Sequence, residues 1–69
     1  MAKYLIVDHD RAWNNTRQEG TFILRYQNNA GLQTEKIVVT SAEEFAVITA
    51  LLKEPRVYWY DNGNIATEV

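Results

Sequence analysis

The chain has 69 residues, of which 46% are hydrophobic and 23% are charged, and its formal net charge at pH 7 is −2. This length and composition predict a single small folded domain over residues 1–69, and they exclude a second domain and the charge-rich class of disordered proteins. Seven basic residues against nine acidic ones argue against a general binder of polyanions, because such proteins depend on clustered Lys and Arg.

The chain contains no cysteine, which removes disulfides, thiolate metal sites and thiol catalysis together. A small secreted domain usually needs disulfides or a bound metal for stability, so we expect a protein of the reducing cytoplasm. The apolar run at residues 4–7 is too short for a signal peptide core or a membrane span. No membrane association and no cofactor are expected.

The first predicted element is a strand at residues 3–8, where apolar side chains fall on both sides of the chain. This pattern predicts a central strand that is buried on both faces. Residues 9–20 show no sustained periodicity and contain two clusters rich in Asp or Asn, which predicts a long loop. Within it, Trp13 is expected to anchor the loop to the body of the domain.

A hairpin is predicted next. Residues 21–27 alternate, with Phe22, Leu24 and Tyr26 on the better-buried face. Residues 28–31 supply Asn and Gly, which tolerate a positive φ, and an extended pattern resumes over residues 32–40.

A helix is predicted over residues 42–54. Ser41 and Glu44 form a capping box, in which the Ser41 hydroxyl accepts from the backbone N–H of residue 44 and Glu44 reaches back to residue 41. An apolar stripe at helical spacing identifies the buried face of this helix, and Pro55 ends it. The stripe consists of Phe45, Ile48 and Leu52.

The last fifteen residues predict a second hairpin, which turns at residues 61–64 through the sequence Asp-Asn-Gly-Asn. Strand alternation sends Val57 and Trp59 to one face and a cationic, aromatic set to the other. We expect Val57 and Trp59 in the core, because the opposite register would bury a guanidinium beside two hydroxyl groups. The set expected on the face away from the helix consists of Arg56, Tyr58 and Tyr60.

Together these elements predict an α+β fold in the order β-(loop)-β-β-α-β-β. The expected architecture is a two-layer sandwich of a four- or five-stranded mixed or antiparallel sheet with the helix at about 42–54 on one face. A right-handed crossover through the helix would place the Val57 strand parallel to the strand before the helix, which would make the sheet mixed.

Only one short segment combines a histidine with carboxylates, and it consists of Asp8, His9 and Asp10. It offers an oriented general base or part of a metal site, but adjacent residues point in different directions and further ligands would have to come from distant Asp or Glu. We therefore interpret the two aspartates as the solvated end of a strand. No catalytic or metal-binding residue is assigned, and the only serine, Ser41, is already used as the helix cap.

The aromatic strand is the main indication of function. We expect a non-enzymatic binding or adaptor module whose interaction face carries Arg56, Tyr58 and Tyr60, extended by Arg25, Tyr26 or Lys36 of neighbouring strands. The expected partner is a second copy, bound through the uncovered sheet faces or a terminal strand, or another protein. The alternatives are a metal-dependent or acid–base enzyme centred on residues 8–10 and a binder of single-stranded nucleic acid, against which the charge argues.

Overall fold

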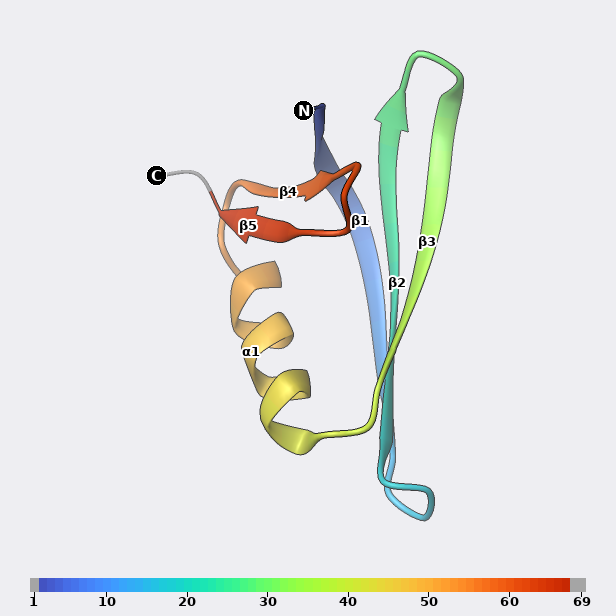
Figure 1. Cartoon of the computed structure of the whole chain (residues 1–69), viewed down its shortest axis with the longest axis vertical. Helices are drawn as coiled ribbons and strands as arrows, with labels where there is room; N and C mark the ends of the chain where they lie inside the picture. The colour runs from blue at the N-terminus through green and yellow to red at the C-terminus, as the bar shows by residue number, and fades with distance from the viewer. Residues whose placement is uncertain (1, 68–69) are drawn as a thin grey trace.

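The computed structural model describes residues 2–67. It contains five strands and one helix in the order β-β-β-α-β-β. The strands form one sheet in the spatial order β3-β2-β1-β4-β5 (Figure 1), with every neighbouring pair antiparallel. The strands are β1 (Lys3–Asn14), β2 (Glu19–Asn28), β3 (Gly31–Val39), β4 (Val57–Tyr60) and β5 (Ile65–Thr67), and the helix is α1 (Ala42–Leu52).

The α+β fold and the central position of the first strand are confirmed. The mixed arrangement is not, because β4 pairs antiparallel with β1 rather than running parallel to β3. Strand β1 belongs to both halves of the sheet: its first residues pair with β4, and its longer second part pairs with β2. The β4–β5 hairpin therefore lies across one end of β1, whereas β2 and β3 run alongside it (Figure 1).

The loop predicted over residues 9–20 is wrong. Strand β1 continues to Asn14 and β2 begins at Glu19, so this segment is a long hairpin with a tight turn. The turn is closed by a hydrogen bond from the Arg17 amide to Asn14 Oδ1 (3.0 Å), and Gln18 adopts a positive φ of 53°. No alternation was apparent over residues 9–14 because none of these residues is buried, so the strand has no apolar face there. A β-bulge precedes this segment: Ile6 pairs with Tyr26 but Asp8 pairs with Arg25, so one extra residue of β1 shifts the alternation by one position.

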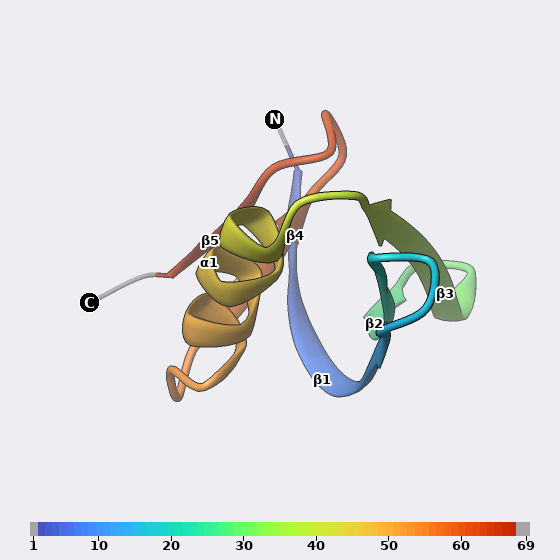
Figure 2. The same cartoon turned by 90° about the horizontal axis from the view of Figure 1, so that it is seen from below.

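The first strand is also not buried on both faces. Of its residues, only Ile6 is buried, and Leu5 and Val7 are 45% and 57% exposed. The physical reason is that α1 covers one face of the sheet, which we call the inner face, as seen from below in Figure 2. The opposite, outer face is not covered by any described element.

The core lies between α1 and the inner face. Phe22 and Leu24 are fully buried at its centre, as the alternation of β2 predicted, and Tyr26 is 6% exposed. The predicted helical stripe packs here: Leu52 is buried and Phe45 and Ile48 pack against the cluster. Further members of the core are Ile6, Val39 and Val57.

Helix α1 begins at the predicted residue. Ser41 Oγ accepts hydrogen bonds from the amides of Glu43 (3.2 Å) and Glu44 (3.4 Å), which is the half of the capping box that Ser41 supplies. The helix ends at Leu52 with Lys53 as its C-cap, two residues before the predicted end. The helix is shorter than predicted because Pro55 disfavours helical geometry in Glu54, the residue that precedes it.

Both predicted turns are present. Gly31, which begins β3, has a φ of 112°, and Gly63 has a φ of 92°, in the left-handed region that favours glycine. In the second turn the Tyr60 amide donates to the Asn64 carbonyl (2.9 Å), and the Asn64 amide donates to Asn62 Oδ1 (3.1 Å). Residues 68–69 of the predicted second hairpin lie outside the described residues.

Candidate functional site

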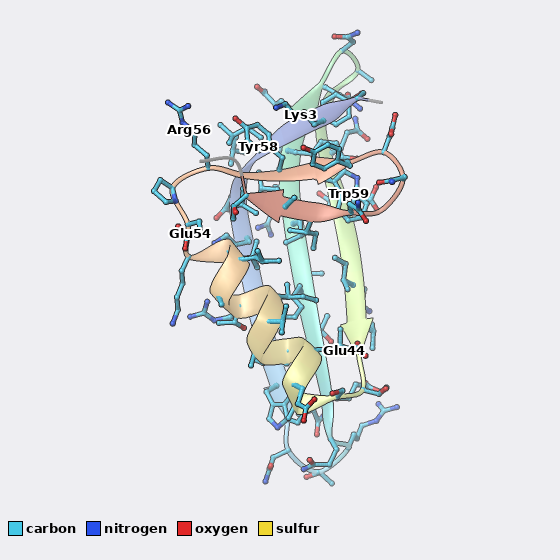
Figure 3. The ribbon with its side chains drawn as sticks, turned by 60° about the vertical axis from the view of Figure 1, so that its left-hand side comes forward. Lys3, Glu44, Glu54, Arg56, Tyr58 and Trp59 are labelled. Carbon is cyan, nitrogen blue, oxygen red and sulfur yellow. The ribbon has the colours of Figure 1, made fainter. Side chains whose placement is uncertain are left out.

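Strand β4 has the predicted register. Val57 is 4% exposed and belongs to the core, and Trp59 packs against it. Tyr58 and Tyr60 therefore point to the outer face and are half-buried there. Arg56 is exposed and precedes the first residue of β4, and its side chain points away from the sheet (Figure 3). The structure thus brings the two tyrosines together on one face but places Arg56 at its margin.

The neighbouring strands add to this face. Tyr58 lies between Leu5 of β1 and Ala66 of β5, and Tyr60 lies opposite Lys3. The Lys3 Nζ sits 4.7 Å from the centroid of the Tyr58 ring, and the two side chains lie side by side in Figure 3. At an exposed site such a cation–π contact is worth about 0.5–1 kcal/mol. We call the set Lys3, Leu5, Tyr58 and Tyr60 the outer tyrosine patch.

The other residues expected to extend this face do not join the patch. Arg25 is on the outer face, but its guanidinium binds Asp8 Oδ2 (3.1 Å) and Asp10 Oδ2 (2.9 Å). The hydrogen bond with Asp10, together with both negative charges, raises the pKa of Arg25. Tyr26 is on the inner face, and Lys36 lies on β3, away from β4.

The acidic segment at residues 8–10 does not form a converged site. Asp8 and Asp10 lie on the outer face with Arg25, whereas His9 is opposite Leu24, whose side chain is buried in the inner core. Strand alternation separates the histidine from both carboxylates. Within residues 2–67, no group of three His, Asp or Glu side chains is arranged to hold a metal ion.

The sequence reasoning missed an aromatic stack on the inner face. The Tyr26 ring stacks on Tyr4, with centroids 5.3 Å apart, and on Trp59, with centroids 6.3 Å apart. The Tyr26 hydroxyl donates to Glu35 Oε1 (3.2 Å). Burial, followed by the hydrogen bond and the charge of Glu35, raises the pKa of Tyr26. No local signal could have shown this stack, because its rings come from three strands.

Trp13 does act as the expected anchor, although it lies on a strand. Its ring meets the edge of Phe45 with centroids 5.3 Å apart, which ties the end of the β1–β2 hairpin to α1. Trp13 therefore has a structural role at this end of the molecule.

Comparison with known proteins adds no assignment. No family model matches the chain, and no curated protein or solved structure matches it significantly. No helix within residues 2–67 has the length and apolar character needed to cross a membrane.

Proposed function

We propose that this protein is a small non-enzymatic binding module whose outer tyrosine patch docks a segment of another protein. One observation carries the proposal: the helix covers the inner face, while on the opposite face Leu5 is 45% exposed beside the half-buried Tyr58. Tyrosine is enriched at protein interfaces, because its ring supplies apolar area and its hydroxyl tolerates both water and a partner.

The chemistry of the patch indicates what the partner carries. Leu5 and the two tyrosine rings offer an apolar surface for an aliphatic or aromatic anchor residue. The exposed Arg56 guanidinium at the margin favours a carboxylate next to that anchor. The proposed partner segment is therefore apolar and acidic.

The separation of His9 from Asp8 and Asp10 supports the non-enzymatic part of the proposal, since these residues were the one constellation that suggested acid–base or metal chemistry. The absence of cysteine supports a reducing compartment, and we propose the cytoplasm.

The test is selection of peptides from a random phage library on the immobilised protein. Selected peptides should be rich in apolar and acidic residues, and their binding should fall at least tenfold with Tyr58→Glu combined with Tyr60→Glu. The matched control is Val38→Glu, which places a carboxylate on the same face of the sheet but on β3. Circular dichroism confirms that each variant is folded.

Peptides that bind the double variant as tightly as the wild type would show that the patch is not the docking surface. A second arm measures binding of a single-stranded oligonucleotide. Salt-dependent binding that is lost with Tyr58→Ala would favour nucleic acid over a protein segment.

A further inference from the structure

Strand β3 has a free edge. It pairs with β2 on one side and is the last strand of the sheet on the other. In Figures 1 and 2 it lies at the margin of the molecule away from α1, so no described element covers it. Alternate backbone N–H and C=O groups along β3 therefore face outward, which is the pattern that pairs with another strand.

Strand β3 carries two charged residues, Glu35 and Lys36, but lacks the other features that usually block edge pairing. It is nine residues long, pairs with β2 without a bulge, and contains no proline. At the opposite edge, β5 has three residues in the described chain. The two large apolar side chains near the ends of β3 are also exposed, Leu32 to 58% and Val38 to 51%. A long, regular edge of this kind favours strand addition.

We infer that two copies of this protein pair through β3, antiparallel and about a two-fold axis at Thr34, to form one continuous ten-stranded sheet. This inference goes beyond the proposed function, because it uses a different surface of the molecule. The partner is a second copy because the side chains of β3 are complementary to themselves in one register.

A two-fold axis between antiparallel strands places one residue opposite its own copy. An axis at Glu35 would oppose two carboxylates, and an axis at Lys36 would oppose two ammonium groups, and both arrangements are unfavourable. An axis at Thr34 opposes two threonines, which form favourable cross-strand pairs. It also sets Gln33 opposite Glu35 of the second copy and Leu32 opposite Lys36, so no like charges meet. Axes farther toward either end of β3 shorten the paired segment.

The inner-face contacts of β3 are compatible with this register. One carboxylate oxygen of Glu35 accepts from the Tyr26 hydroxyl. The other oxygen can accept a hydrogen bond from the side-chain amide of Gln33 in the second copy. The pairing thus adds a hydrogen bond to Glu35 without removing the one it has.

The test uses charge at the axis. Sedimentation should show the wild type at twice its 8.0 kDa chain mass, and Thr34→Glu and Thr34→Lys should each be monomeric, because each opposes two like charges. An equimolar mixture of the two variants should restore the dimer, since Glu then faces Lys. The matched controls are Gln27→Glu and Gln27→Lys, which make the same changes on β2 opposite Leu32, and they should stay dimeric.

A wild type that is monomeric at millimolar concentration would overturn the inference. So would Thr34 variants that remain dimeric, or two monomeric variants that do not recombine. The Tyr58→Glu and Tyr60→Glu double variant separates this inference from the proposed function, because it should remain a dimer while losing peptide binding. If it becomes monomeric while the Thr34 variants stay dimeric, the copies associate through the outer tyrosine patch instead.

Discussion

At the scale of single residues, Gly20 lies at a close contact between the sheet and the Phe45 side chain of the helix. It faces Trp13 on β1 and Val39 on β3, and the Phe45 ring lies directly over it. A Cβ at this position would overlap the Phe45 ring and lie 3.1 Å from Val39 Cγ2. The glycine is therefore needed for space, since its φ is not in the left-handed region.

We expect Gly20→Ala to lower the free energy of unfolding by about 1–3 kcal/mol, because the ring must move to accept the methyl group. Urea denaturation followed by circular dichroism measures the loss. The same substitution in a Phe45→Leu background should cost less, since the ring is gone. An equal cost in both backgrounds would show that the ring is not the obstacle.

Tyr26 predicts a pH dependence. Its pKa is raised above the ordinary value of 10.0 by burial and by Glu35, so the folded state holds the phenolic proton more tightly than the unfolded state. The associated stability is fully present below pH 10.0 and is lost as the pH rises through the folded pKa. The free energy of unfolding should therefore fall less steeply above this pH in Tyr26→Phe than in the wild type. Equal slopes of the unfolding free energy against pH in the two proteins would contradict a raised pKa of Tyr26.

At the scale of elements, the β1–β2 hairpin makes a specific prediction for hydrogen exchange. Strand β2 is paired on both sides, whereas β1 beyond its bulge is paired with β2 alone. We expect continuous protection over residues 20–26, protection of alternate amides over residues 9–14, and fast exchange at turn residues 15–18. Fast exchange throughout residues 9–18 would instead indicate that this segment is the loop predicted from the sequence.

The N-cap of α1 gives a second prediction at this scale. Ser41→Ala should lower the free energy of unfolding by about 1 kcal/mol, because the amides of Glu43 and Glu44 lose their acceptor. Ser41→Asp should preserve most of the stability, since a carboxylate caps the same amides. Thermal denaturation of the three proteins compares these effects. Identical melting temperatures would show that the Ser41 cap does not stabilise the helix.

At the scale of the whole molecule, a single core holds both halves of the sheet. Leu24 is fully buried, whereas Val47 on the far side of α1 is 60% exposed. We expect Leu24→Ala to cost about 2–5 kcal/mol, and Val47→Ala to change stability by about 0.5 kcal/mol or less. Trp13 and Trp59 lie in different parts of the sheet, so coincident fluorescence and circular dichroism transitions would show that the domain unfolds as one unit.

The sequence by itself determined the features that depend on neighbouring residues. Asn and Gly marked both predicted turns, Ser41 marked the start of the helix, and alternation identified the buried face of β2 and the register of β4. These signals could be read because turns, caps and strand faces are controlled by residues a few positions apart. The two tyrosines of the candidate site were found in this way.

Tertiary structure alone decided the rest. Pairing with β2 holds residues 9–14 of β1 in an extended strand although none of them is buried, so the sequence had no apolar alternation there and indicated a loop. The pairing of β4 with β1 made the sheet antiparallel, and the pairing of β2 with β1 placed Arg25 between Asp8 and Asp10, where it binds both carboxylates. Each of these outcomes depends on contacts between segments far apart in the chain, whose relative energies no local pattern contains.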